Sequence, residues 1–179
     1  EFHIKELSNT IDLREGDIVL DVACGNGTLL RELSKKQKIQ ANGIDVSEKM
    51  IHVAKMRYPN MNFEVKPCHP LEWSDESIDI ITICCAFHHF ENPQGFVNGC
   101  KRVLKKEGTV YVADPNFGAV LRFFANIFWV PFSKSGDVRV YSPKELETFF
   151  YNSGFKIVQV YRKDKGLFLK AKNNNKFQV

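Results

Sequence analysis

The stretch VLDVACGNGTLL at residues 19–30 decides the fold of this chain. Residues 18–22 are aliphatic apart from Asp21, which favours a buried parallel strand, and residues 28–34 favour a helix. Gly25 and Gly27 lie between them, where a ligand can approach the backbone closely because glycine has no Cβ. The amide groups at the start of the helix would face that ligand. The stretch therefore predicts a loop that binds a nucleoside cofactor.

The glycine pattern departs from the dinucleotide fingerprint G-x-G-x-x-G/A, because Leu30 stands three positions beyond Gly27. This departure weakens the interpretation of an NAD site. Asp45 ends a second short apolar run, where its carboxylate could accept hydrogen bonds from both hydroxyls of a ribose. That position fits more than one nucleoside cofactor.

The order D-x-x-x-G-x-G, then Asp45, Ser47 and Met50, resembles class I S-adenosylmethionine-dependent methyltransferases. The closest resemblance is to the small-molecule group that includes the ubiquinone and menaquinone biosynthesis enzymes. Three further blocks match in the same order, namely SDESIDIITICCAFHHFENP (74–93), RVLKKEGTVYVADP (102–115) and SPKELETFFYNSGFKIVQVY (142–161). The resemblance runs from Leu13 to Ala171. An α/β domain without a nucleotide is the alternative that these blocks disfavour.

The resemblance implies a Rossmann-like three-layer sandwich whose seven-stranded, mostly parallel sheet has the order 3-2-1-4-5-7-6 and ends in an antiparallel hairpin. The apolar periodicity agrees, because strands and helices alternate along the chain. Helices are predicted at 2–11, 27–36, 47–57, 93–104 and 143–152. Strands are predicted at 18–22, 40–44, 62–65, 78–84 and 109–113, followed by a hairpin that turns at Asp164, Lys165 and Gly166.

The length of 179 residues favours one methyltransferase domain over residues 1–179. Because the sequence begins at Glu1 without a methionine, we expect an incomplete N-terminus, with most of the N-terminal helices that close the active site in the resembling family missing. The sequence has neither a run of 18 uncharged apolar residues nor a secretory segment. These features favour a cytoplasmic protein.

The five cysteines show no C-x-x-C spacing, so we expect reduced thiols and no metal site. Cys84 and Cys85 fall in a strand pattern and should point to opposite faces. Small buried hydrophobic side chains are favoured there over a redox role. From Lys156 onward there are seven basic residues against one acid, which leaves contact with nucleic acid or an acidic partner as an alternative. Few aromatic residues accompany these charges, so a solvated hairpin is favoured.

The resemblance also implies the cofactor contacts. Asp21 would orient the glycine loop and approach the cofactor's amino group, while Asp45 would hold the ribose. Pro67 stands where many relatives have an aspartate for the adenine amino group, so Cys68 backbone or His69 is expected to replace it. The expected cofactor-binding residues are Asp21, Ala23, Cys24, Gly25, Gly27, Asp45, Val46, Met50, Cys68, His69 and Cys85.

The loop after the fourth predicted strand, CAFHHFENP, should border the methionine end of the cofactor. His88 or His89 could accept a proton from a hydroxyl nucleophile, although the alternative that they only shape the loop is favoured. Methyl transfer from a sulfonium mainly requires alignment, so a general base can be absent and no catalytic residue is assigned. The sequence from Asp114 to Phe117 resembles the D-P-P-Y loop of amino-group DNA methyltransferases but follows the wrong strand.

Residues 117–141 form an aromatic insertion before the last helix. The spacing of Leu121, Phe124, Phe128 and Pro131 fits one helical face, which predicts a lid over a nonpolar substrate. A contact in a homodimer or an ordinary core segment is the alternative. The expected substrate residues are His88, His89, Phe124, Phe128, Trp129 and Tyr141.

These patterns predict an S-adenosylmethionine-dependent methyltransferase that methylates a small, partly apolar molecule and releases S-adenosylhomocysteine. Two alternatives stay open. One is a module that binds the cofactor without catalysis, and the other is an RNA methyltransferase, which only the basic C-terminal segment suggests.

Overall fold

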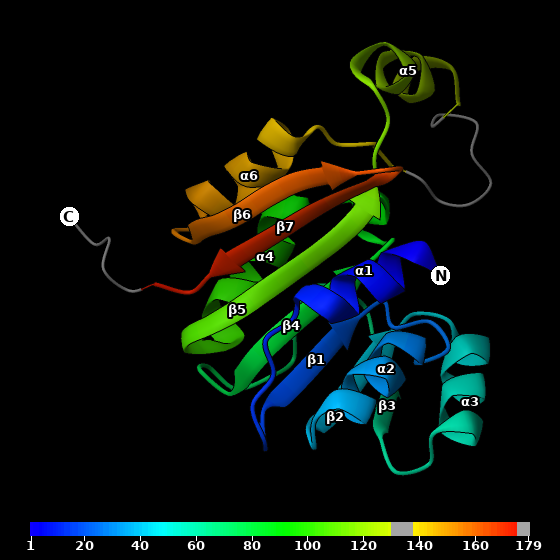
Figure 1. Cartoon of the computed structure of the whole chain (residues 1–179), viewed down its shortest axis with the longest axis vertical. Coiled ribbons are helices and arrows are strands. Elements are labelled where there is room, and N and C mark those ends of the chain that lie inside the picture. Colours follow the sequence, from blue (N-terminus) through cyan, green and yellow to red (C-terminus); the bar gives the residue numbers. More distant parts are fainter. Residues whose placement is uncertain (130–137, 175–179) are drawn as a thin grey trace.

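The computed structural model describes residues 1–129 and 138–174, apart from the side chains of Val120, Phe128 and Trp129. Seven strands of this described part form one sheet in the order β3-β2-β1-β4-β5-β7-β6 (Figure 1). Strand β7 runs opposite to the other six and so pairs antiparallel with both β5 and β6. The strands are β1 (Ile18–Val22), β2 (Gln40–Asp45), β3 (Asn62–Val65), β4 (Ile78–Cys84), β5 (Leu104–Pro115), β6 (Lys156–Lys163) and β7 (Gly166–Lys172). The predicted order and C-terminal hairpin are confirmed.

Helices cover both faces of the sheet, as a parallel sheet with buried strands requires. On one face lie α1 (Phe2–Thr10), α2 (Thr28–Lys36) and α3 (Glu48–Arg57). On the other face lie α4 (Pro93–Val103) and α6 (Pro143–Asn152). The insertion contributes α5 (Ala119–Phe124), which continues into a wider helical turn at Ala125–Trp129 and stands away from the sheet (Figure 1). The three-layer, Rossmann-like architecture is therefore confirmed.

Two buried clusters hold the layers together, one on each face of the sheet. Leu20 and Ile81 belong to the same buried cluster as Phe96 of α4. Their neighbours along the strands, Val19 and Ile80, belong to the cluster on the side of α1 and α2. Alternate residues of β1 and β4 thus enter different cores, which explains why both strands read as continuous apolar runs.

Strand β5 is longer than the sequence predicts, because it begins at Leu104 rather than at residue 109. Its first residues are mostly charged, and this composition is typical of a loop. The sheet nevertheless pairs Leu104 with Ile78, and the backbone of Glu107 and Gly108 bonds to Asn173. Polar strand residues are tolerated here because their side chains lie exposed or half-buried at the end of the sheet.

Three basic side chains of the C-terminal hairpin pair with acids elsewhere in the chain. Lys163 pairs with Glu6, Lys170 with Asp12 and Lys172 with Glu107, each at 2.7 Å. These pairs neutralise part of the basic segment locally, which favours the solvated hairpin over a nucleic-acid surface. Among the described residues, no helix has both the length and the apolar character needed to span a bilayer.

Candidate active site

The glycine loop after β1 depends on left-handed backbone at three positions. Ala23, Gly25 and Gly27 have φ angles of 57°, 52° and 78°. A Cβ built on Gly27 would lie 2.7 Å from Cζ of the buried Phe63, so close packing as well as the φ angle requires glycine there. A Cβ on Gly25 would meet no atom within 4 Å. The loop therefore leaves open space above Gly25.

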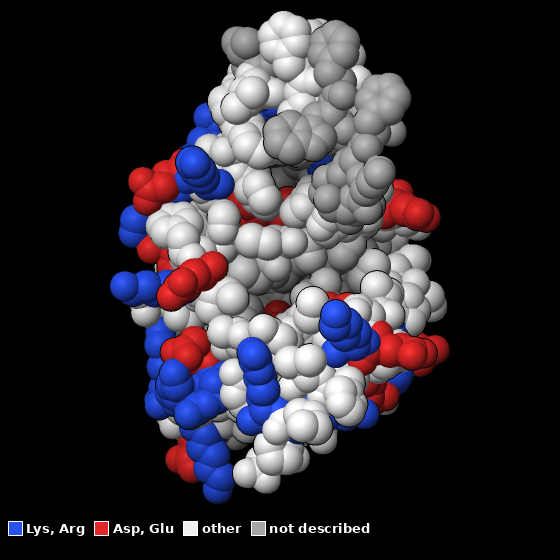
Figure 2. Space-filling view, turned by 90° about the vertical axis from the view of Figure 1, so that its right-hand side faces the viewer, with Lys and Arg blue, Asp and Glu red and all other residues white. Residues whose placement is uncertain are grey.

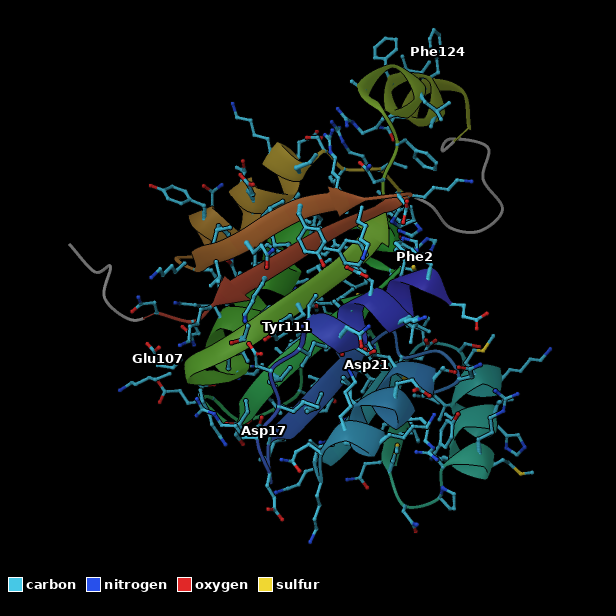
Figure 3. The ribbon with its side chains drawn as sticks, in the orientation of Figure 1. Phe2, Asp17, Asp21, Glu107, Tyr111 and Phe124 are labelled. Atoms are coloured by element: carbon cyan, nitrogen blue, oxygen red, sulfur yellow. The ribbon has the colours of Figure 1, made fainter. Side chains whose placement is uncertain are left out.

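That space belongs to a pocket of about 270 Å³ at the carboxyl ends of β1 and β4. Its lining residues are Glu1, His3, Ile4, Asp21, Ala23, Cys24, Gly25, Asn26, Thr28, Leu29, Cys84 and Cys85. The structure thus brings together Asp21, Ala23, Cys24, Gly25 and Cys85 from the predicted cofactor set. Figure 3 shows Asp21 in the region between β1 and α1.

Helix α1 forms one wall of this pocket, a role that sequence analysis missed. Glu1, His3 and Ile4 line the cavity, and His3 also stacks on Phe168 of β7, with ring centroids 6.0 Å apart. In the described part of the chain, His3 Nε2 is buried without a hydrogen-bond partner. The apolar residues of 2–11 indicate a helix, but only the tertiary structure places that helix over β4 and β5.

Asp21 is buried at the end of β1, where the Thr82 hydroxyl of β4 donates a 2.6 Å hydrogen bond to its carboxylate. Burial raises the pKa of Asp21 from its ordinary value of 3.8 to about 7, although the Thr82 bond partly opposes this rise. The negative charge of Asp45 raises it further. A cation bound in the pocket would favour the ionised form of Asp21.

We expect Asp21 to make the empty protein less stable as pH rises from about 4 to about 7. In this range the folded state holds a proton that the unfolded state has lost, so the free energy of unfolding falls by up to about 1.4 kcal/mol per pH unit. Above both pKa values the contribution is constant. Asp21→Asn keeps an oxygen for Thr82 and should flatten the curve in urea titrations at several pH values. An unchanged slope in this variant would assign the pH dependence to other groups.

Asp45 organises the rim of the pocket. Its carboxylate accepts hydrogen bonds from the Gly25 amide at 2.9 Å and the Ser47 amide at 2.8 Å. Next to it Val46 and Met50 are 71% and 42% exposed, so apolar side chains lie uncovered where the resemblance predicts adenine. Asp45, Val46 and Met50 are not lining residues of the cavity itself. The pocket encloses the space at the glycine loop, whereas Val46 and Met50, beside Asp45, lie on the open surface.

Cys68 and His69 do not line the pocket either. Cys68 packs against the core cluster that contains Leu71 and Phe96, whereas His69 is exposed. Their assignment to the adenine edge stays a prediction.

Cys84 and Cys85 do not point to opposite faces, and that expectation is wrong. Cys85 has a φ of 56°, which ends the alternation of the strand. Both residues line the same pocket, Cys84 as the last residue of β4 and Cys85 just beyond its end.

A buried pair of titratable side chains lies beside the loop after β4. His88 Nδ1 and Asp114 Oδ1 are 2.9 Å apart, and both side chains are largely buried. Burial raises the pKa of Asp114, while the hydrogen bond and charge of His88 lower it. Sequence analysis set Asp114 aside. The signal that could have found it is the parallel pairing of β4 with β5, which brings Asp114, near the end of β5, to the same edge as the loop after β4.

The other predicted substrate residues fall into two groups. Tyr141 is 7% exposed and packs edge-on against Phe87 and Phe149, so the structure places it in the aromatic core. The ring of His89 lies over that of His88, with centroids 4.0 Å apart. Phe124 is on α5, whereas the side chains of Phe128 and Trp129, with Pro131, fall outside the described part of the chain.

Helix α5 exposes its large apolar side chains. Leu121, Phe123 and Phe124 are 58%, 60% and 50% exposed, and Phe124 projects from the top of the molecule in Figure 3. Asn126 ties the insertion to its return segment, since its side chain accepts from the Val140 amide and donates to the Val140 carbonyl. Because Leu121, Phe123 and Phe124 are exposed, this face of helix α5 is not packed in the core. Figure 2 shows a mainly uncharged surface below the insertion, with acidic atoms in the hollow.

The sheet is Rossmann-like, a glycine loop follows β1, and acidic residues lie at the ends of β1 and β2. Together these features define an α/β protein of the class that binds nucleoside cofactors. Comparison with known proteins narrows this class. Residues 13–146 match the family model described as "Methyltransferase domain". The chain belongs to this family and is an S-adenosylmethionine-dependent methyltransferase.

Individual relatives agree with the family match. The demethylmenaquinone methyltransferase of Thermotoga maritima is 30% identical over 157 residues, which cover 82% of this chain and 68% of that protein. The ubiquinone biosynthesis O-methyltransferase of Coxiella burnetii is 28% identical over 167 residues, covering 88% of this chain and 70% of that protein. The YcgJ protein of Bacillus subtilis shares the fold, with a TM-score of 0.83 at 20% identity over 97% of this chain and 99% of that one.

Proposed function

We propose that this protein transfers the methyl group of S-adenosylmethionine to a quinone-type or phenolic ring that carries an apolar portion. The observation that carries the proposal is the pocket at the glycine loop, which joins Asp21, Gly25 and Cys85 at the carboxyl ends of β1 and β4. The names of the Thermotoga and Coxiella relatives support this acceptor class. When bound, the cofactor would supply an activated methyl group, which the acceptor atom would attack in line as S-adenosylhomocysteine leaves.

The residues of the pocket fit the cofactor. The open space above Gly25 is what a ligand against the backbone requires, and Asp21 offers a carboxylate for the amino group. Asp45 would accept from the ribose hydroxyls, and Val46 and Met50 offer uncovered apolar surface to the base. His3 Nε2, buried and without a partner in the described structure, could donate to a carboxylate of the ligand.

His88 is the proton acceptor in this proposal, and Asp114 is its positioning residue. His88 Nδ1 lies 2.9 Å from Asp114 Oδ1. In this proposal Nδ1 carries the proton that the carboxylate accepts, so Nε2 is the nitrogen that acts as the base. A base positioned in this way can take the proton of a phenolic hydroxyl as the oxygen is methylated.

We expect His88→Ala to lower the rate of methyl transfer by roughly 10²- to 10⁴-fold, because positioned general bases contribute about this much. The wild-type rate should rise with pH as the imidazole loses its proton, and this limb of the pH profile should disappear in the variant. Asp114→Asn should lower the rate less while retaining a side chain that can bond to His88. Affinity for S-adenosylhomocysteine, measured by calorimetry, is the control and should stay within about twofold of wild type. A variant that retains the rate and the pH limb would reduce His88 to a structural role.

The insertion at 117–141 acts in this proposal as a lid over the apolar part of the acceptor. Exposure of Leu121, Phe123 and Phe124 supports the lid over the alternative of a fixed core. A contact between two copies of the chain is the competing explanation for the same exposure.

Phe124→Ala is expected to leave the melting temperature nearly unchanged, because the side chain is half-exposed, whereas truncation in a core would cost roughly 3–5 kcal/mol. It should raise the KM for an acceptor with an apolar tail several-fold. The KM for the same ring without the tail should not change. Phe150→Ala, in the fully buried core, is the matched control and should melt much earlier. A large loss of stability in Phe124→Ala, with or without a change in oligomeric state, would contradict the lid.

Binding and turnover together test the function. Calorimetry should show binding of S-adenosylhomocysteine and no binding of NAD. Methyl-labelled cofactor should label hydroxylated quinone or phenol acceptors and should not label RNA. Cofactor binding without transfer to any acceptor would favour the binding module, whereas label in RNA would favour the RNA methyltransferase. Binding of NAD alone would overturn the proposal.

A further inference from the structure

Arg122 of helix α5 has a guanidinium group that the fold does not satisfy. The side chain is half-buried, and its Nη1 atom is buried without a hydrogen-bond partner in the described part of the chain. The more exposed Arg102, by contrast, donates to two backbone carbonyls and pairs with Asp75. A charged donor that is buried and unpaired costs free energy, so such a group is expected where a ligand supplies the acceptor.

A second unsatisfied polar atom lies at the start of the same insertion. Asn116 follows β5, and its Oδ1 atom is buried without a partner among the described residues. The Arg122 amide donates a 2.8 Å hydrogen bond to the Gly118 carbonyl, so one helical turn separates Arg122 from the segment that contains Asn116. A ligand at this place must offer an acceptor to the guanidinium and a donor to the amide oxygen. A hydroxylated ring that carries a carboxylate offers both.

Hydrogen bonds connect this part of the insertion to the loop that contains His88. Arg122 and Asn126 are four residues apart and therefore share one face of the helix. The Asn126 side chain forms two hydrogen bonds with the backbone of Val140. The amides of residues 138 and 139, in the same return segment, donate to the His88 carbonyl at 2.9 and 3.1 Å. The helical face that holds Arg122 is thus anchored to the residue proposed to accept the proton.

Asp114 does not supply the acceptor that Arg122 lacks. Its carboxylate lies 2.9 Å from His88 Nδ1. Burial raises the pKa of Asp114, and the opposing hydrogen bond and charge come from His88, with a smaller contribution from His89. Among the described residues, Arg122 has no acid as a partner, so its positive charge favours an anionic ligand.

We propose that Arg122 binds an ionised carboxylate on the ring of the acceptor, so that the substrate is a hydroxylated aromatic acid. A guanidinium presents several N–H groups in one plane, which suits the two oxygens of a carboxylate. This inference narrows the acceptor class of the proposed function and rests on it. Because Arg122 contacts the carboxylate and not the reacting oxygen, it acts on acceptor binding and leaves the chemical step to the groups near His88.

Two acceptors that differ in charge test this specificity in the whole chain with methyl-labelled cofactor. One is an alkyl-substituted dihydroxybenzoate, and the other is the corresponding neutral benzamide. In the wild type we expect a KM about ten- to a hundredfold lower for the benzoate, as hydrogen bonds between charged groups contribute. Arg122→Gln should raise the benzoate KM by about this factor, leave the benzamide KM within about twofold, and change kcat little. Arg122→Lys keeps the charge and should recover part of the loss.

The controls separate recognition of the carboxylate from a structural role. Arg162→Gln removes an exposed arginine of β6 and should change neither KM. Arg122→Gln should melt no earlier than the wild type and bind S-adenosylhomocysteine equally well, because Nη1 has no partner to lose. A lower melting temperature in this variant would assign Arg122 to the structure. That result, equal KM values for the two acceptors in the wild type, or an unchanged benzoate KM in Arg122→Gln would overturn the inference.

Binding measured without turnover distinguishes this inference from the proposed function. With S-adenosylhomocysteine in place of the methyl donor, calorimetry measures the affinity for the same dihydroxybenzoate. Binding that Arg122→Gln weakens about ten- to a hundredfold, without methyl transfer in the turnover assay, would support the carboxylate site and overturn the proposed methylation. Methylation of the benzamide alone would support the proposed function and overturn the carboxylate site. Neither binding nor transfer with either acceptor would overturn both.

Discussion

Gly27→Ala is expected to lower the free energy of unfolding by roughly 2–5 kcal/mol. About 1–2 kcal/mol comes from the left-handed φ of 78° with a Cβ present, and a further 1–3 kcal/mol comes from overpacking. The new methyl group would lie 2.7 Å from Phe63 Cζ and 3.1 Å from Tyr58 Cδ2. Phe63 is only 3% exposed, so its ring has little room to withdraw. Urea titration measures the loss, which corresponds to a melting temperature lowered by roughly 4–20 °C.

Gly25→Ala is the matched control, because it changes the same residue type in the same loop. Its φ of 52° carries a similar backbone cost, but its Cβ meets no atom within 4 Å. We therefore expect a loss of only about 1–2 kcal/mol in stability. Because Gly25 lines the pocket, the added methyl group should instead weaken binding of S-adenosylhomocysteine. Equal stability losses in the two variants would refute the packing argument.

Asp45→Ala is expected to weaken binding of S-adenosylhomocysteine by about ten- to a hundredfold. A hydrogen bond to a charged carboxylate contributes roughly 1.5–3 kcal/mol, and each 1.4 kcal/mol is tenfold in affinity. The structure adds a second cost that the sequence did not indicate. The Gly25 and Ser47 amides would lose their acceptor, so the loop itself should be less stable.

Two further variants separate these costs. Asp45→Asn retains one acceptor oxygen and should melt closer to wild type, while still binding the ligand more weakly. Asp12→Ala removes an exposed acid that pairs with Lys170 outside the pocket, and it should change neither binding nor stability much. Calorimetry and thermal melting measure both quantities. Wild-type affinity in Asp45→Asn and Asp45→Ala would show that this carboxylate does not touch the ribose.

Local signals in the sequence predicted several elements at their observed bounds. Helix α6 begins after Ser142, and the side chains of Ser142 and Glu145 form a capping box. The boundary of this helix therefore depends on two residues only three positions apart. Strands β1 and β4 also match, because an apolar run bounded by polar residues defines them. Strand β3 matches as well, although its four residues NFEV alternate polar and apolar side chains. Strand β5 was predicted too short, because pairing with β4 and β7 overrides the charged composition of its first residues.

The sequence by itself determined the alternation of strands and helices, the glycine loop and the acids at the ends of β1 and β2. These features depend on residues close together in the chain, so periodicity and residue type suffice to find them. Only the tertiary structure decided that α1 walls the pocket, that Asp45 holds the Gly25 amide, and that His88 meets Asp114. These contacts join residues 20 or more positions apart, so they depend on strand order and register. The shared cavity of Cys84 and Cys85 depends instead on one backbone angle, which residue type does not specify.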